Sequence, residues 1–479
     1  YIEKDKGRSQ VLKIGVGRDF CYGPDDRTYI HGSTNVWESL VYLDQNLQPV
    51  ACIAESWKSY NKGRVWIFRI RSGIRFHDGS LLSPLDVVSS MKRLKSHPRY
   101  DTTGSVRSLI SVEQSDIDKV TFKVDKPTPH FPSLLAYYGS PIFKASIFSD
   151  DGSITYPIAT GPYKVERIKK GEVIELSRFD RYWGKKGEFK SVTFRYIPDA
   201  QTRLFALVRG DIDVIADVGS VLPAQIEEIE RNESLLLKRS EVATTHYMLF
   251  NCKRYPFNER KSRLWLFSLL DRNNIVDMLT EGTGIPAYSF YTPLAKRWRF
   301  NTISMKGCMK KYSAPEIDRK ISIIINSRLI HRWPYHQLAE VILEILESKA
   351  LKAEIKLMES GDYFESIKEG DFDITIQPNT LINGDPDIFY SYYFSSDSSR
   401  DIGYRNPVVE SLISTARHEM DSGLRRDQYK RIAEIIGKDL PIIPLYHDVT
   451  VYAHTKQISN FLLDPLFRPL LTYVKHTKL

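Results

Sequence analysis

The spacing of apolar side chains predicts strands in the first half of the chain. Residues 65–71 (VWIFRIR) and 119–124 (KVTFKV) place bulky apolar side chains at every second position. Such alternation is typical of strands that bury one face. Between them, Ser83 is a suitable helix N-cap, Pro84 suits the first helical position, and Asp86 lies three residues after the cap. These signals predict a helix that begins at Pro84.

The second half alternates helices with strands. Residues 335–350 carry an apolar stripe at helical spacing, while residues 353–357 and 372–376 have the pattern of strands. A helix-sized segment separates these two strands. The order therefore predicts α/β units with right-handed crossovers.

Two further helices are expected near the C-terminal end. Asn406 caps the first, with Pro407 at its first position, and Tyr429 lies in the second, which is predicted to stop at Gly437. The chain holds no internal repeat and no low-complexity linker. Any domains are therefore expected to be joined by short crossing strands.

Length and composition indicate a large folded chain. The 479 residues amount to about three domains at roughly 150 residues each. Hydrophobic residues make up 42% and charged residues 27%, which excludes a mostly disordered or collagen-like chain. No apolar run approaches the ~18 residues that a membrane helix needs. The net charge of +9 comes without a zinc-finger or RNA-binding motif, so we interpret it as a mildly basic surface and expect no nucleic-acid partner.

The four cysteines, Cys21, Cys52, Cys252 and Cys308, form no CxxC pair and have no histidine at zinc-ligand spacing. No structural metal site is therefore expected. Two alternatives stay open: free thiols, or two disulfides. For disulfides, Cys21 with Cys52 and Cys252 with Cys308 is the simplest of three pairings. The chain begins at Tyr1 and not at Met, as expected if a leader segment was removed.

The motifs of common enzyme classes are missing from the sequence. It has no GxSxG, HExxH or GxxxxGK[ST] pattern, and its 11 histidines are scattered. Close carboxylate pairs, such as Asp211 with Asp213 and Asp371 with Asp373, are explained more simply by strand ends and turns. We therefore predict a protein that is not an enzyme and holds no cofactor.

Aromatic residues make up 12% of the chain and gather at residues 137–138, 288–291 and 389–394. Tyrosine combines an apolar ring with a hydroxyl group at low entropic cost, so such clusters suit a small-molecule or peptide pocket. Packing between domains is the alternative interpretation of the same segments.

Several ordered segments resemble one protein family. They are similar to successive stretches of the large extracellular solute-binding proteins of ABC importers, which include the oligopeptide-, dipeptide- and nickel-binding proteins. Each match is short, but together they cover roughly residues 10–465. The segments are 71–88 (RSGIRFHDGSLLSPLDVV), 160–165 (TGPYKV), 181–184 (RYWG), 204–213 (LFALVRGDID), 385–387 (DPD), 403–407 (GYRNP) and 440–446 (LPIIPLY).

This resemblance implies an α/β chain with the type II periplasmic-binding-protein fold, in which two α/β lobes are joined by a hinge. An extra strand-rich domain is inserted near the start. A solute would lie in the cleft between the lobes and would be buried by hinge closure. The implied division places lobe I in residues 1–37, 155–240 and 440–479, the extra domain II in residues 38–154, and lobe II in residues 241–439.

The resemblance also implies a function. A substrate-binding protein of an ABC importer captures a peptide-like or similar small solute and delivers it to the permease subunits in the membrane. We expect a monomer in the periplasm or outside the cell, with a lipid anchor to the cytoplasmic membrane as an open possibility. The alternatives are a ligand-sensing regulatory domain of the same fold, and a binder of nickel or other metal chelates or of oligosaccharides.

The resemblance suggests where the solute would be bound. In the dipeptide binders of the family, an aspartate just before an NGDPD-type turn pairs with the ligand's α-amino group. The matching residue is Ile382, and an apolar side chain leaves a buried ammonium group unpaired, at a cost of several kcal/mol. Ordinary capture of a peptide through its free amino terminus is therefore not expected. The candidate ligand contacts are Tyr22, Tyr29, His31, Tyr137, Tyr138, His246, Thr380, Leu381, Ile382, Asp385, Tyr404, Arg405 and His447.

Overall fold

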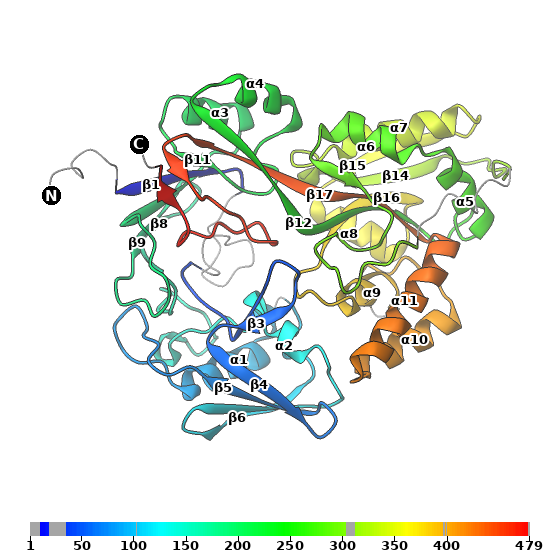
Figure 1. Ribbon diagram of the computed structural model, residues 1–479. Coiled ribbons are helices and arrows are strands. Elements are labelled where there is room, and N and C mark those ends of the chain that lie inside the picture. Colours follow the sequence, from blue (N-terminus) through cyan, green and yellow to red (C-terminus); the bar gives the residue numbers. More distant parts are fainter. Residues whose placement is uncertain are drawn as a thin grey trace. The chain divides into compact units, whose positions relative to one another are not determined.

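The computed structural model describes residues 10–18, 35–101, 103–302, 312–395, 398 and 400–477. The chain divides into two compact units: unit 1 comprises residues 1–240 and 451–479, and unit 2 comprises residues 241–450. It passes between the units within two long strands, β12 (Leu235–Phe250) and β17 (Ile442–Thr455), which are labelled in Figure 1. The predicted division into two lobes and an inserted domain stays a prediction.

Unit 1 contains a mixed sheet with the order β11–β1–β10–β9–β8, and β17 lies beside β11. Strand β1 is parallel to both β10 and β11, whereas β9 and β8 continue the sheet in antiparallel fashion. The apolar core under this sheet contains strand residues such as Ile14 and Phe194, together with Tyr452, Phe461 and Leu471 from the end of the chain. The C-terminal segment is therefore part of the unit 1 core. The strands are β1 (Val11–Val16), β8 (Tyr163–Lys169), β9 (Val173–Arg178), β10 (Ser191–Tyr196) and β11 (Val214–Ile215).

A second sheet of unit 1 has the order β4–β5–β7–β6. The strands predicted at residues 65–71 and 119–124 are confirmed as β5 and β7, which pair Trp66 with Phe122. The helix predicted at Pro84 is confirmed as α1 (Pro84–Ser96), and the backbone N–H of Ser83 donates to Asp86 Oδ2 at 2.9 Å. Figure 1 shows α1 beside this sheet. The strands are β4 (Ala54–Tyr60), β5 (Val65–Ile70), β6 (Leu109–Asp116) and β7 (Lys119–Val124).

Unit 2 is built on a sheet with the order β15–β14–β16–β12–β17. Strand β14 is parallel to both of its neighbours, while β12 runs antiparallel to β16. The predicted alternation of helices and strands is confirmed, because α7 connects β14 to β15 and α8 connects β15 to β16. These elements are β14 (Ile321–Asn326), α7 (Tyr335–Glu347), β15 (Ala353–Met358), α8 (Ser360–Glu369) and β16 (Ile374–Thr380).

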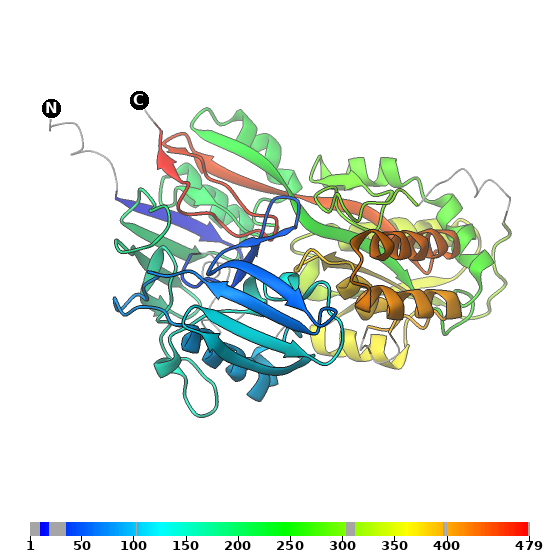
Figure 2. The same ribbon diagram turned by 60° about the horizontal axis from the view of Figure 1, so that its bottom comes forward.

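The last two helices of unit 2 lie side by side in Figures 1 and 2. The first, α10 (Pro407–His418), has the predicted cap, since Asn406 accepts hydrogen bonds from the backbone of Val408 and Val409. The second, α11 (Ser422–Asp439), does not stop at Gly437 as predicted. Gly437 does not adopt the left-handed conformation of a terminating glycine, and Leu440, with a φ of 45°, follows the last turn instead. A Cβ on Gly437 would lie 2.7 Å from the carbonyl oxygen of Thr302.

The aromatic segments of unit 2 form one packed cluster. Phe389 contacts the rings of Tyr247, Phe290, Tyr291 and Tyr393, with centroid distances of 5.2–5.9 Å. All five side chains are buried. For these residues, packing inside unit 2 explains the clustering without a ligand pocket.

The remaining elements are shorter and complete the two units. The elements are β2 (Val41–Leu43), β3 (Pro49–Ala51), α2 (Phe131–Leu134), α3 (Ala200–Val208), α4 (Ile226–Arg231), α5 (Arg260–Leu269), α6 (Arg272–Thr280), β13 (Gly284–Pro286), α9 (Asp387–Tyr393), β18 (Ile458–Ser459) and β19 (Lys475–His476), with 3-10 turns at Pro98–Tyr100, Tyr137–Gly139, Ala145–Ile147, Pro223–Gln225 and Ser327–Leu329.

No helix among the described residues is long and apolar enough to cross a bilayer. Cys52 and Cys252 carry free thiols, while Cys21 and Cys308 lie outside the described residues.

Candidate functional site

The parallel strands β14, β15 and β16 end at a common edge of the unit 2 sheet. In open α/β sheets, ligands bind beyond the carboxyl ends of such strands. Thr380 ends β16, and its hydroxyl oxygen lies 2.7 Å from that of Thr244 on β12. The next residue, Leu381, donates its N–H to Ala243 O at 2.8 Å. The predicted contacts Thr380, Leu381 and Ile382 therefore lie at this edge, beside β12.

His447, another predicted contact, is held in place at the same part of β12. Its Nδ1 lies 2.9 Å from the hydroxyl oxygen of Thr245. Burial, with smaller contributions from nearby Arg299 and His246, lowers the pKa of His447 to about 3. The imidazole is therefore neutral at physiological pH and offers a hydrogen bond, not a charge.

His246 lies among aromatic rings. It stacks on Tyr446 with a centroid distance of 4.1 Å and contacts Trp333 and Tyr335 edge-on at 5.0 and 5.7 Å. Its Nδ1 lies 2.6 Å from Tyr335 Oη, and its Nε2 lies 3.7 Å from Asp448 Oδ2. His246 thus lies among four further residues, Trp333, Tyr335, Tyr446 and Asp448, and we call these five residues the polar cluster. The indole of Trp333 is half-buried.

Three other predicted contacts in unit 2 are engaged in pairs of their own. Asp385 accepts two hydrogen bonds from the buried guanidinium of Arg425, at 2.6 and 2.8 Å. Tyr404 donates to Asp439 Oδ2 at 2.6 Å, and Arg405 donates to both carboxylate oxygens of Asp401. These hydrogen bonds link the three residues to other parts of unit 2, and none of them has Thr380 as its partner.

The predicted contacts in unit 1 are only partly described. Tyr137 is buried, donates its hydroxyl to Leu43 O at 3.0 Å, and lies under the guanidinium of Arg468 at 3.4 Å. Burial raises the pKa of Tyr137. The side chain of Tyr138 and the residues Tyr22, Tyr29 and His31 lie outside the described part of the chain.

Unit 1 also holds a buried carboxyl group that the sequence did not single out. Glu38 accepts hydrogen bonds from Thr160 Oγ1, Tyr182 Oη and Trp183 Nε1, each at 2.8 Å. Burial dominates and raises the pKa of Glu38 to about 7. The Tyr-Trp-Gly motif at residues 182–184 was the available signal, since two of its side chains supply these donors.

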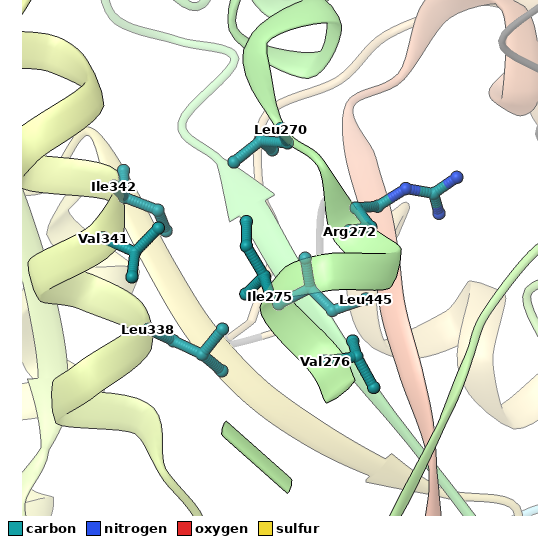
Figure 3. Close-up of a pocket in the computed structure, with 8 residues that line it drawn as sticks. All are labelled: Leu270, Arg272, Ile275, Val276, Leu338, Val341, Ile342 and Leu445. Carbon is teal, nitrogen blue, oxygen red and sulfur yellow. The ribbon is translucent and has the colours of Figure 1, made fainter. Parts of the chain in front are cut away.

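Unit 2 contains two cavities that could serve as alternative sites. The first, between α6, α7 and β17, has a volume of about 10 Å³, which is room for little more than one water molecule. Figure 3 shows its apolar lining, with Leu338, Val341 and Ile342 facing Ile275, while the guanidinium of Arg272 points away. We interpret this cavity as a packing gap.

The second cavity, of about 210 Å³, lies between α9 and α10. It contains the predicted contact Arg405 and also Arg417, but Arg405 is paired with Asp401 and Arg417 with Asp387. Its cations are therefore already neutralised by the protein. No group of three or more potential metal ligands occurs among the described residues.

Four residues of the polar cluster were missed by the sequence analysis: Trp333, Tyr335, Tyr446 and Asp448. A charged residue inside the apolar run of β17 was the usable signal, because an aspartate in a buried strand needs a specific partner. Trp333 lies just before α7, and Tyr335 is the first residue of that helix. The sequence around them does not indicate which strand their side chains contact.

Comparison with known proteins places this arrangement in a family. Residues 48–307 match the sequence model of one family, described as bacterial extracellular solute-binding proteins, family 5 Middle. The dipeptide-binding protein of Escherichia coli (strain K12) is 24% identical over 481 residues, covering 92% of this chain and 88% of that protein.

Two solved structures show the same fold. NikA from Brucella suis in complex with Fe(III)-EDTA has a TM-score of 0.86 at 19% identity, covering 97% of this chain and 100% of that chain. The dipeptide binding protein from Pseudoalteromonas sp. SM9913 in complex with Met-Leu has a TM-score of 0.81 at 18% identity, covering 98% and 100%. They confirm the predicted type II periplasmic-binding-protein fold. Because the family match extends over more than half of the chain, this protein belongs to the bacterial extracellular solute-binding proteins of family 5.

Proposed function

We propose that this protein is the substrate-binding component of an ABC importer and that it captures a peptide or peptide-like solute outside the cytoplasmic membrane. The family membership supports this function, and the relatives named above include binders of dipeptides. The observation that carries the proposal to a particular place is the carboxyl edge of the unit 2 sheet, where the hydroxyl groups of Thr244 and Thr380 meet. The neighbouring residues of β12 contact His447 and Trp333.

The chemistry of this edge suits a peptide. The hydroxyl groups of Thr244 and Thr380 can donate and accept hydrogen bonds, as backbone amides require. The half-buried ring of Trp333 offers an apolar surface for a side chain. Selection among peptides would therefore rest on hydroxyl groups, one neutral imidazole and aromatic rings.

The same edge argues against catalysis. Thr245 and His447 lie within hydrogen-bond distance, as a nucleophile and its base would. However, a histidine whose pKa is lowered to about 3 is a poor general base at neutral pH. We therefore propose that the protein binds its solute and releases it unchanged.

The remaining parts of the proposal concern the cell. We propose that the chain acts as a monomer in the periplasm or at the outer side of the cytoplasmic membrane, and that permease subunits accept its solute. Capture by closure of two lobes, and a lipid anchor, remain predictions.

A screen of thermal stability tests the function. The purified protein is heated with pooled di- and tripeptides, with metal chelates including Ni(II)–histidine, with oligosaccharides, or with an equal concentration of free amino acids as the control. We expect a peptide pool to raise the melting temperature, because a ligand at one hundred times its Kd stabilises the folded state by about 2.7 kcal/mol. A response to chelates or sugars alone would contradict the peptide assignment, and silence in every arm would contradict solute binding.

A further inference from the structure

The buried carboxylates of the described residues differ in how their charge is compensated. Most of them form ion pairs with arginine: Asp217 with Arg18, Asp373 with Arg319, Asp385 with Arg425, Asp401 with Arg405, and Asp464 with Arg468. Two of the buried acids in this part of the chain, Glu38 and Asp448, lack such a partner. Glu38 accepts three hydrogen bonds from neutral donors, which leaves Asp448 as the exception.

Asp448 is buried, with 5% of its surface exposed, yet few protein groups compensate the negative charge of its side chain. Its Oδ2 accepts one hydrogen bond, from Trp333 Nε1 at 3.2 Å. Both contacts recorded for this carboxylate among the described residues, with Trp333 and with His246, involve Oδ2. Taking a carboxylate out of water with a single neutral donor is costly, so a buried charge of this kind normally has a cationic partner.

A second unpartnered group points at Asp448. His246 is fully buried, and its Nε2 has no hydrogen-bond partner, although it lies 3.7 Å from Asp448 Oδ2. Buried polar atoms without partners are rare in folded proteins, and each one calls for an explanation. Two neighbouring groups left unsatisfied on one face of β12 and β17 indicate a missing partner at this point.

The surroundings specify the kind of partner. The indole of Trp333 lies against the carboxylate, and the rings of Tyr335 and Tyr446 lie next to it around His246. A carboxylate whose neighbours are a neutral N–H donor and aromatic rings favours an organic cation, which it can hold by a charge-assisted hydrogen bond. A metal ion would need more ligands than the described residues supply here.

We propose that Asp448 binds a cationic amino group of the solute, with the indole of Trp333 beside it and His246 as a positioning residue. The inference rests on the proposed peptide-binding function and deepens it by giving the solute a free amino group. It also explains how an amino group could be accommodated in a chain with Ile382 at the turn after β16, since the anion is supplied by β17.

Acetylation of the amino group, combined with Asp448→Asn, tests the assignment. The probes are Met-Leu and a pool of lysine-free di- and tripeptides, each measured by calorimetric titration in its free and N-acetylated form. We expect acetylation to weaken binding to the unchanged protein by about tenfold or more, the loss of one charge-assisted hydrogen bond. In D448N this penalty should fall to about twofold or less, because the two changes remove the same interaction.

Asp427→Asn is the matched control, since Asp427 is an exposed aspartate on α11 in the same unit. It carries the same change of charge and should keep the full acetylation penalty. An equal penalty in the unchanged protein and in D448N would overturn the assignment, because the amino group would then be bound elsewhere. Tight peptide binding without any acetylation penalty would also overturn it while leaving the proposed function intact. Failure of the unchanged protein to bind any free peptide would overturn both.

Discussion

At the scale of single residues, the partners of a buried ionisable group decide how far its pKa shifts. Glu38 and Asp385 are both buried acids of this chain. Asp385 faces an arginine, whereas Glu38 faces a threonine, a tyrosine and a tryptophan. Neutral donors compensate a buried carboxylate less completely than a cation does, and burial raises the pKa of Glu38.

This difference predicts a pH-dependent contribution to stability. The pKa of Glu38 is about 7 in the folded protein, whereas the ordinary pKa of a glutamate side chain is 4.5. Between these values the folded state holds more protons than the unfolded state, so stability falls as the pH rises through this window. Glu38→Gln removes the titration while keeping the size of the side chain. Relative to E38Q, the unchanged protein should lose about 3 kcal/mol of unfolding free energy between pH 4.5 and pH 8.

The measurement is chemical denaturation of both proteins across this pH range. Glu228→Gln, at an exposed position of α4, is the matched control and should parallel the unchanged protein at every pH. Parallel curves for E38Q as well would show that Glu38 stays ionised in the folded state and would contradict the prediction.

The candidate contacts show what the sequence can and cannot give at this scale. Thr380 and His447 are predicted ligand contacts, and in the structure both make polar contacts with β12. Asp385 is a predicted contact as well, yet its carboxylate is paired with Arg425, forty residues further along the chain. Which distant side chain neutralises a charge depends on tertiary packing, and periodicity and local motifs carry no information about it.

At the scale of elements, local signals were sufficient where the deciding interaction is local. The start of α1 follows from Ser83, Pro84 and Asp86, which contact one another within a single turn. The strand β7 begins and ends as its alternation predicts. The predicted end of α11 was wrong because Gly437 stays helical and Leu440 is the left-handed residue that ends the helix. Gly437 lies against Thr302, a residue far away in the sequence.

Gly437 therefore yields a prediction that reverses the usual effect of glycine in a helix. Glycine to alanine in a helix interior normally stabilises by up to about 1 kcal/mol. In Gly437→Ala the new Cβ would lie 2.7 Å from a backbone carbonyl oxygen, so a main-chain segment has to move. We expect G437A to destabilise the protein by about 1–3 kcal/mol, measured by thermal or chemical denaturation.

Gly361→Ala is the control for this substitution. Gly361 lies in α8 of the same unit, and a Cβ there would meet nothing within 4 Å. G361A should therefore leave stability unchanged or raise it. If G437A behaved like G361A, the close approach of Thr302 to α11 would not be a constraint on the helix.

At the scale of the whole molecule, the two units use the chain differently. Unit 2 is one continuous stretch, whereas unit 1 is assembled from both ends of the chain. The C-terminal segment supplies six buried side chains to the main core of unit 1: Tyr452, Ile458, Phe461, Leu463, Leu471 and Val474. At about 1.5–3 kcal/mol for each buried side chain, the six contribute about 9–18 kcal/mol, which is comparable with the total stability of a typical domain.

We therefore expect fragments of the chain to differ in whether they fold. A fragment of residues 241–450 retains the cluster of Ile324, Tyr363, Ile367 and Phe372 and should unfold cooperatively, as followed by circular dichroism and calorimetry. A fragment of residues 1–240 lacks the six side chains and should show no cooperative transition. Joining residues 451–479 to it through a short glycine- and serine-rich linker restores those side chains at a small entropic cost and should restore the transition. Cooperative unfolding of the 1–240 fragment without the added segment would mean that the strands β1 and β8–β10 form a sufficient core by themselves.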